Sequence, residues 1–517
     1  MSEPAIEPAE AGTGEREVRR SARWPWILLL LLVVLLPLGL GGNRPWAWSV
    51  AGLVASALLL AWGALVAVDR APFAWRPALI GPAVLFAIVT LWLVVQTWAP
   101  VPEGLANPIW QMASEALGRG LPGRISADPE GGQVGLIHLL TNATVFWLAL
   151  QYGRDRDRAE RLLEWIVLAS LAYAIYGIVN YVAGNETLLF APRVSYASDV
   201  TGTFVNRNNY ATYAGVTLLA AVVLAIRHYR ARLRVADPAL SRAGRTMEAM
   251  AGLPAVYATA GVVIAMAWLQ SHSRMGFAST AGAMVVLLAL LRLTGIIRGW
   301  LILGVLALCA GAALLLVSGG GVIDRLDATS SFDRASLFDD VRAMIGSTPW
   351  IGSGYGSFAA VFSLFRHPLF ATGSDITQAH NTYYELCAEI GIPATILLCG
   401  AVAWLALLCL IAGFRRTRDQ VIPILAFAAT VLVGLHATTD FSLQIPGMVV
   451  TYMAILGVGV AQSWSPEARR RGRLGAGARL SARGRKLRYP ATNTGTTLAA
   501  PPARFIRPVS DARVWRP

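Results

Sequence analysis

Residues 378–393 read QAHNTYYELCAEIGIP and close the longest polar interval between two apolar runs, which extends from Gly319 to Glu389. The rest of the chain up to Ser465 consists mainly of apolar runs of about 17 to 23 residues, each long enough to cross a hydrocarbon core of roughly 30 Å as a helix. The pattern predicts an all-α, polytopic integral membrane protein whose helices hold this polar interval at one face of the bilayer.

The composition favours a membrane protein over the other classes that a basic chain suggests. Of the 517 residues, 55% are hydrophobic and only 14% are charged, whereas soluble domains contain about a quarter charged residues. The net charge of +14 is carried by short connections and tails without interleaved aromatic residues, which indicates membrane topology instead of nucleic-acid binding. We therefore expect membrane lipid, and no nucleic acid, as a partner. The four cysteines fall mainly in apolar runs and predict no disulfide framework.

The hydropathy of the chain predicts about twelve transmembrane helices. They fall at residues 24–42, 46–68, 77–98, 134–152, 162–183, 208–226, 254–271, 275–292, 299–318, 392–412, 421–438 and 446–464. Alternating the connections between the two sides assigns 34 of the 44 Lys and Arg residues to one side, and such an excess marks the cytoplasm. Both termini are thus predicted to be cytoplasmic, with one large periplasmic loop at 319–391 that carries short helices.

The predicted spans divide the chain into four parts. Residues 1–23 form a disordered cytoplasmic tail, and residues 24–199 contain the N-terminal transmembrane helices. Residues 200–464 form the transmembrane core with the large periplasmic loop, and residues 465–517 form a basic, disordered cytoplasmic tail. The span interiors contain almost no Asp, Glu, Lys, Arg or His, whereas ion-coupled transporters usually need titratable groups at mid-membrane. The polar chemistry is therefore expected at the outer face.

The first candidate segment is TGTFVNRNNYATYAG at residues 201–215, where a polar loop meets the sixth span. Arg207 stands between Asn206 and Asn208. Asn residues often cap helix starts, and an Arg at a helix end often extends to lipid headgroups. The functional alternative is an arginine, held by amides, that binds phosphate through paired N–H donors.

The second segment, SHSRMG at residues 271–276, is a tight turn between two apolar runs and contains Arg274. A hairpin exposed to headgroups could carry one Arg without any function. Two outer arginines beside small polar residues nevertheless match the two phosphates of a pyrophosphate.

The third segment combines PWIGSGYGSF, residues 349–358, with the stretch after His380. Alternating glycines predict a tight loop around the central tyrosine, but no helix of the dinucleotide-binding type follows. Asn381, Glu385 and Glu389 recur every four residues and share one face of a predicted helix. His380 stands at the start of this helix, where an imidazole could reach a substrate hydroxyl, although a single His in a loop is more often a surface residue.

The fourth segment, HATTDFSLQIP at residues 436–446, contains His436 and Asp440 at a spacing of four. These side chains could meet at the outer interface. The pair is predicted to have a structural role, as an orienting hydrogen bond.

Taken together and in this order, the segments resemble the O-antigen ligase and O-antigen polymerase superfamily of bacterial membrane glycan-transfer enzymes. The residues that carry the resemblance are TGTFVNRNNYA, SRMGF, GSGYGSF, AHNTYYELCAEIGIPA and DFSLQIP. The resemblance implies a metal-independent, inverting glycosyltransferase of lipopolysaccharide biosynthesis that works without cofactors. It also implies a multi-pass protein of the bacterial inner (plasma) membrane with a periplasmic active site.

The resemblance further implies the substrates and the roles of individual residues. The donor would be a glycan on undecaprenyl diphosphate, and the acceptor a glycolipid such as lipid A–core or another glycan. Arg207 and Arg274 would bind the donor diphosphate, and His380 would act on the acceptor hydroxyl. The candidate substrate-binding residues are Asn206, Asn208, Asn381, Glu385, Glu389 and Tyr355, and the orienting residues are His436 and Asp440.

Several functions remain open at this point. A ligase would transfer the glycan to lipid A–core, a polymerase would join two lipid-linked repeat units, and protein O-glycosylation is a third form of the same chemistry. A membrane transporter or flippase is the alternative from a different class, and a non-catalytic membrane scaffold is the last. No nucleotide site is visible in the sequence, and the predicted outer loops contain no Asp-x-Asp metal motif; Asp339 with Asp340 is the nearest candidate there.

Overall fold

The computed structural model of the chain describes residues 23–71, 73–193, 195–297, 328–366, 376–416 and 419–464. In these ranges the structure is almost entirely helical, which confirms the predicted helical class, and it adds one small antiparallel sheet of β1 (Thr187–Leu188) and β2 (Ala191–Pro192). The predicted ninth span and the predicted tails, apart from Arg23, lie outside the described residues.

Helices occupy every predicted span that the structure describes. The helices of the first part are α2 (Arg23–Leu35), η1 (Leu36–Leu38), α3 (Pro45–Ala67), η2 (Pro77–Leu79), α4 (Ile80–Trp98), α5 (Ile109–Leu117), α6 (Pro129–Tyr152) and α7 (Arg156–Val182). The helices of the second part are α8 (Arg207–Leu233), α9 (Arg242–Met250), α10 (Leu253–Leu269), α11 (Arg274–Leu293), α14 (Ala328–Ser347), α15 (Phe358–Phe362), α16 (Thr382–Ile390), α17 (Ile392–Arg415), α18 (Val421–His436), η4 (Ser442–Gln444) and α19 (Pro446–Ala461).

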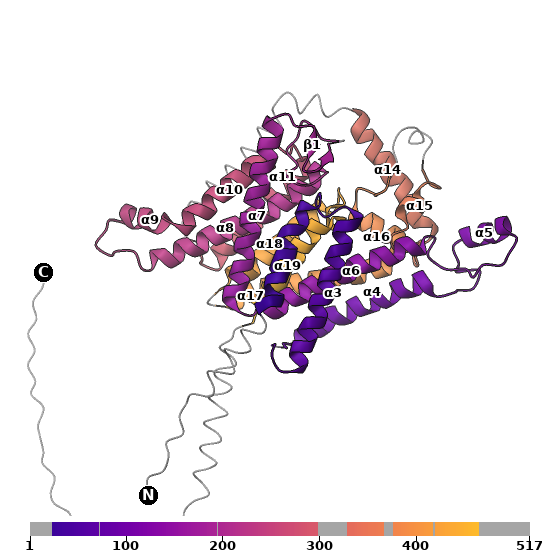
Figure 1. Ribbon diagram of the computed structural model, residues 1–517, viewed down its shortest axis with the longest axis horizontal. Helices are drawn as coiled ribbons and strands as arrows, with labels where there is room; N and C mark the ends of the chain where they lie inside the picture. Colours follow the sequence, from indigo (N-terminus) through magenta and orange to yellow (C-terminus); the bar gives the residue numbers. More distant parts are fainter. Residues whose placement is uncertain are drawn as a thin grey trace, which may run out of the picture. The chain divides into compact units, whose positions relative to one another are not determined.

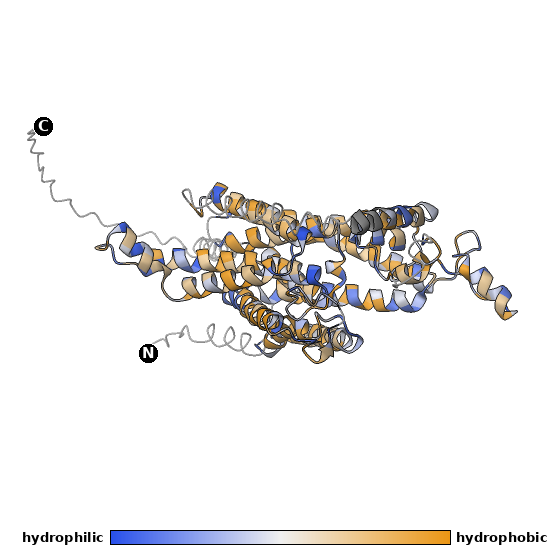
Figure 2. Cartoon of the chain, turned by 90° about the horizontal axis from the view of Figure 1, so that it is seen from above, coloured by the Kyte–Doolittle hydropathy of each residue, from blue (hydrophilic) through white to orange (hydrophobic). Residues whose placement is uncertain are grey.

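Seven of the described helices are long and apolar enough to cross a membrane, namely α3, α4 with η2, α6, α7, α8, α11 and α17. Helices α9 and α10 form an eighth candidate that is bent by 70°, and α2 with η1, α18 and α19 are shorter apolar helices. Figure 2 shows the apolar residues along these helices. The total of twelve spans and the sides of the connections stay predictions.

Helix α8 is longer than the span predicted for it, which ended at residue 226 with a loop over 227–253. Its 27 residues correspond to about 40 Å of helix at 1.5 Å per residue. Arg230 and Arg232 lie in its last turn, where positive side chains are favoured by the helix dipole. Because α9 and the start of α10 follow, much of the predicted loop is helical.

The core of the protein surrounds α8 and α19. Almost every residue of α19 is buried, and α8 is the most buried of the candidate spans. Glycines let neighbouring helices approach α19 closely: Gly457 packs against Phe146 and Ala149 of α6, and Gly459 packs against Ala426 of α18. In Figure 1, α18 and α19 lie among the other long helices.

Helices α14, α15 and α16 precede α17 in the sequence and form a smaller core of their own. They match the short helices predicted for the interval 319–391. The buried residues of this core include Leu337, Val341, Phe358, Phe362 and Ala388. The three helices lie together in Figure 1. Helix α16 passes into α17 through Gly391, whose φ of +82° is readily adopted only by glycine.

Candidate active site

Asp440 lies in the turn between α18 and α19 and is only 1% exposed. Its Oδ2 lies 2.9 Å from Ser442 Oγ and 3.2 Å from His436 Nε2, and its Oδ1 lies 3.8 Å from His380 Nδ1. Burial alone would raise the pKa of Asp440, but the contacts with the two histidines and Ser442 hold it below its usual range. Asp440 is therefore an ionised carboxylate that attracts and orients the imidazoles around it.

His380 directly precedes the helix cap of α16. The side chain of Asn381 accepts hydrogen bonds from the backbone N–H groups of Tyr383 and Tyr384, both at 3.0 Å, as an N-cap does. The backbone of His380 has a φ of +52°, and its ring lies edge-on to Phe441 with 5.1 Å between centroids. With 35% of its side chain exposed, His380 presents an oriented imidazole to which an alcohol could lose a proton.

Arg207 and Arg274 are the first residues of α8 and α11, and the structure joins these two helix starts. Asn206 caps α8 by accepting the N–H of Asn208 at 2.8 Å, and Ser273 caps α11. Ser273 Oγ in turn donates to the Oδ1 of Asn208 at 2.7 Å. Helix N-termini and guanidinium groups both attract anions, so the joined starts form a region suited to phosphate.

Asp199 is a residue of this region that the sequence did not reveal. It is buried, and its Oδ2 accepts a hydrogen bond from Arg207 Nη1 at 2.9 Å, while its Oδ1 lies 2.8 Å from His272 Nδ1. The Arg207 guanidinium also lies over the Tyr196 ring at 5.3 Å. Because His272 belongs to the turn that precedes Arg274, Asp199 connects the two arginine-bearing segments. Its place in an irregular polar loop gave no periodic signal from which this contact could be predicted.

The segment from His436, at the end of α18, to Ser442 contacts both arginine-bearing helices. Ser442 Oγ lies 3.0 Å from Asn209 Oδ1 and 3.0 Å from Thr212 Oγ1, both on α8. On the other side, His436 Nδ1 lies 3.3 Å from Ser279 Oγ of α11. His380, Asp440 and the starts of α8 and α11 therefore belong to one region of the protein, although none of the contacting pairs across helices is close in sequence.

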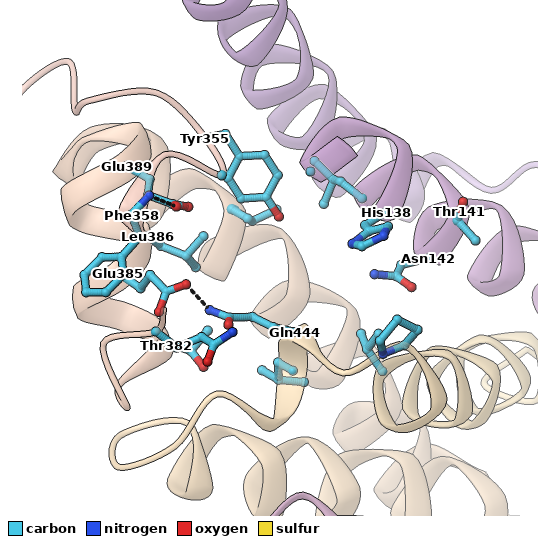
Figure 3. Close-up of a pocket in the computed structure, with 18 of the residues that line it drawn as sticks. His138, Thr141, Asn142, Tyr355, Phe358, Thr382, Glu385, Leu386, Glu389 and Gln444 are labelled. Atoms are coloured by element: carbon cyan, nitrogen blue, oxygen red, sulfur yellow. Dashed lines mark hydrogen bonds between the residues drawn. The ribbon is translucent and has the colours of Figure 1, made fainter. Parts of the chain in front are cut away.

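A cavity of about 690 Å³ opens between α3, α6, α16, α17, α18 and α19 (Figure 3). Tyr355, Glu385 and Glu389 line this cavity, whereas Arg207, Arg274 and His380 do not. The structure thus places the predicted site residues in two neighbouring groups. One group contains the arginine-bearing helix starts and the histidines that contact Asp440, and the other lines the cavity.

Glu385 and Glu389 anchor the backbone of the segments around them. Glu385 accepts the N–H of Ala379 at 2.7 Å and the side-chain amide of Gln444 at 2.6 Å, and Glu389 accepts the N–H of Phe358 at 2.9 Å. Burial, reinforced by the charge of Glu389, raises the pKa of Glu385. Burial also raises the pKa of Glu389 to about 7. Both carboxyl groups therefore hold the neighbouring loops through hydrogen bonds. They also line the cavity, although part of their hydrogen-bonding capacity is already used.

The glycine-rich loop before α15 packs closely against the start of α6. Gly352, Gly354 and Gly356 have φ values of +68°, +107° and +76°, as the predicted tight loop requires. A side chain on Gly354 would collide with Ser126. This close approach sets the Tyr355 ring on the cavity wall.

A separate polar cluster lies near the other end of α8. Glu160, Glu164 and His228 place possible metal-ligand atoms within 4.8 Å of one another. Arg227 binds both oxygens of Glu160, at 2.9 and 2.7 Å, so the group forms an ion-pair network between α7 and α8. His228 is about 30 Å along the helix from Arg207, and the cluster is therefore distinct from the candidate active site.

These features define a protein of long apolar helices in which two arginine-bearing helix starts are joined through Ser273 and Asn208 and a partly exposed histidine lies 3.8 Å from the buried Asp440. Residues 259–399 match the family model described as O-antigen ligase. The match confirms the predicted relationship to the O-antigen ligase and polymerase superfamily, and it includes Arg274, Tyr355 and His380, whereas Arg207 and Asp440 lie outside it. No curated protein matches the chain.

Proposed function

We propose that this protein moves a glycan from undecaprenyl diphosphate to a glycolipid acceptor at the periplasmic face of the bacterial inner membrane, as an O-antigen ligase does. The observation that carries the proposal is the junction of two helix starts, each beginning with an arginine, beside the His380–Asp440 pair. The O-antigen ligase family match over residues 259–399 supports the same class of reaction.

The donor diphosphate fits the arginine-bearing helix starts. Asp199 takes one N–H of Arg207 through Nη1, and Arg207 Nε has no hydrogen-bond partner among the described residues. The guanidinium is therefore oriented while it keeps donors for phosphate oxygens. Compensating the negative charge of the diphosphate in a water-poor site makes it a better leaving group.

The acceptor hydroxyl fits the exposed part of His380. The oxygen of the acceptor hydroxyl forms a bond to the anomeric carbon of the donor sugar, while the bond from that carbon to the diphosphate oxygen breaks. The hydroxyl proton passes to His380, and the ionised Asp440 stabilises the imidazolium that results. A single displacement of this kind inverts the configuration at the anomeric carbon and releases undecaprenyl diphosphate.

A polymerase would use the same arginines and histidine with a second lipid-linked repeat unit as acceptor. A gel of surface glycan from a deletion strain distinguishes the two reactions. We expect lipid A–core to lose all long glycan chains, as for a ligase, whereas a single repeat on the core would indicate a polymerase. An unchanged ladder would contradict both, and uptake of a solute by proteoliposomes would then favour a transporter.

A further inference from the structure

The cavity between α6 and α16–α19 differs in charge from the arginine-bearing region. None of its lining residues in the described part of the chain is Lys or Arg. The ionisable residues of the lining are Glu130, Glu385, Glu389, His138, Tyr355, Tyr383, Tyr452 and Cys399. A phosphate placed here would meet carboxyl groups without a compensating fixed cation, which is unfavourable in a mostly apolar environment. The cavity is therefore suited to an uncharged ligand.

Polar side chains nevertheless line the cavity from more than one direction. Helix α6 contributes His138, Thr141 and Asn142, and these lie across the space from Glu385 and Thr382 in Figure 3. His138 Nε2 is buried and has no hydrogen-bond partner among the described residues. Because buried polar atoms are nearly always hydrogen-bonded in native proteins, this atom points to a ligand that bonds it.

The remaining lining has the character of a site for a sugar attached to an apolar chain. Trp48 lies edge-on to His138 with 4.7 Å between ring centroids, and Trp48 and Tyr355 both line the cavity. Sugar hydroxyls both donate and accept hydrogen bonds, as imidazole and amide partners require, and aromatic rings pack against the apolar face of a sugar. Val402, Met453 and their apolar neighbours provide a wall for an alkyl chain.

The cavity also lies next to the reacting histidine. Thr382, two residues after His380, lines the cavity, as do Leu443 and Gln444, which follow Asp440 closely. The Asp440 turn contacts α8 through Ser442. The same turn thus borders the cavity and also contacts the helix that begins with Arg207.

We propose that this cavity binds the acceptor through an uncharged, hydroxylated sugar, and that Trp48, His138 and Asn142 determine its specificity. The role of this ligand as acceptor rests on the proposed glycan transfer. The binding of a sugar-bearing lipid in the cavity does not depend on that transfer. The donor diphosphate and the acceptor sugar are thereby assigned to different sites.

The binding is tested with the purified full-length protein in lipid nanodiscs and two photo-crosslinking probes. One probe is dodecyl β-D-glucoside and the other is dodecyl phosphate, each with the same diazirine in its alkyl chain. We expect the glucoside to label α17 and α19 and the phosphate to label them at least about fivefold less. His138→Phe and Asn142→Leu should each reduce glucoside labelling about fivefold or more, as the loss of a hydrogen bond does.

Trp48→Ala should weaken glucoside labelling, and its control is Trp46→Ala, which changes a tryptophan on the same helix outside the cavity lining. Thermal unfolding of each variant identifies any that fails to fold. Equal labelling by the phosphate probe, or full labelling of both α6 variants, would overturn the inference. Labelling needs no donor, so a protein that is labelled as expected but transfers no glycan would contradict the proposed function and leave the sugar site standing.

Discussion

Nδ1 of His380 and Oδ1 of Asp440 lie 3.8 Å apart, and neither atom has a hydrogen-bond partner among the described residues. The distance is within ion-pair range but exceeds that of a hydrogen bond. A shift of less than about 1 Å in the His380 side chain would bring the two atoms into hydrogen-bond contact. Such contact would fix the ring tautomer so that Nε2 faces the acceptor.

We expect His380→Ala to abolish or severely reduce glycan transfer, because general-base assistance is worth about 10²–10⁴-fold. Donor binding should be unchanged, so lipid-linked donor should accumulate in cells. A surface-glycan gel and thin-layer analysis of the lipid fraction measure both effects. His228→Gln, at the far end of α8, provides a control that should transfer normally; a normal ladder in the His380 variant would disprove this mechanism.

Arg207→Lys and Arg274→Lys should each lose most activity although the charge is kept. Lysine cannot reproduce the planar set of donors that binds phosphate oxygens in pairs. The loss should correspond to about 2–4 kcal/mol of transition-state stabilisation, which is about 30-fold or more in kcat/KM. Arg119→Lys, in the exposed connection after α5, is the matched control. If both site variants gave near-normal ladders, these arginines would only contact headgroups.

The helices and their caps could be predicted from the sequence because both depend on local pattern. Apolar runs gave the positions of helices such as α17, and Asn206 stands at a helix start where asparagine is favoured. The spacing of four residues between His436 and Asp440 likewise allowed their contact to be predicted. Local spacing was sufficient in each of these cases. Asn381 was predicted to share a helical face with Glu385 and Glu389, whereas it caps α16 from outside the helix.

The remaining features of the site depend on contacts between distant segments. The Ser273–Asn208 bond spans 65 residues, and the contact of His272 with Asp199 spans 73. No periodic pattern links such positions, because their separation depends on how the intervening helices pack. The division of the predicted residues between the Asp440 region and the cavity could not be predicted for the same reason.

The stability of the protein should decrease as the pH rises toward neutrality because of Glu389. Burial raises its pKa from 4.5 to about 7, so its acid form favours the folded state. This contribution is complete below about pH 4.5 and is lost as the pH rises through 7, with about 1.4 kcal/mol for each unit of pKa shift. Thermal unfolding between pH 4.5 and 8 should show a flatter profile for Glu389→Gln than for the exposed control Glu115→Gln. An unchanged slope would contradict the assignment.

Glycan transfer should proceed in excess EDTA, because arginines compensate the diphosphate charge in the proposed mechanism. Asp339 forms an exposed ion pair with Arg342, and pairs of this kind contribute little to stability. Asp339→Ala and Asp340→Ala should therefore have small effects on transfer by the purified protein. Inhibition by EDTA that added Mg²⁺ reverses would disprove the metal-independent reaction.

The positive φ of His380, +52°, has a practical consequence for testing its role. Glycine adopts this left-handed conformation without strain, so His380→Gly should keep the backbone path into α16 while it removes the imidazole. The space beside Phe441 and Asp440 would then match free imidazole in size and in hydrogen bonding. Added imidazole should restore transfer in a saturable way, so the protein could be switched on by a small molecule supplied from outside the cell.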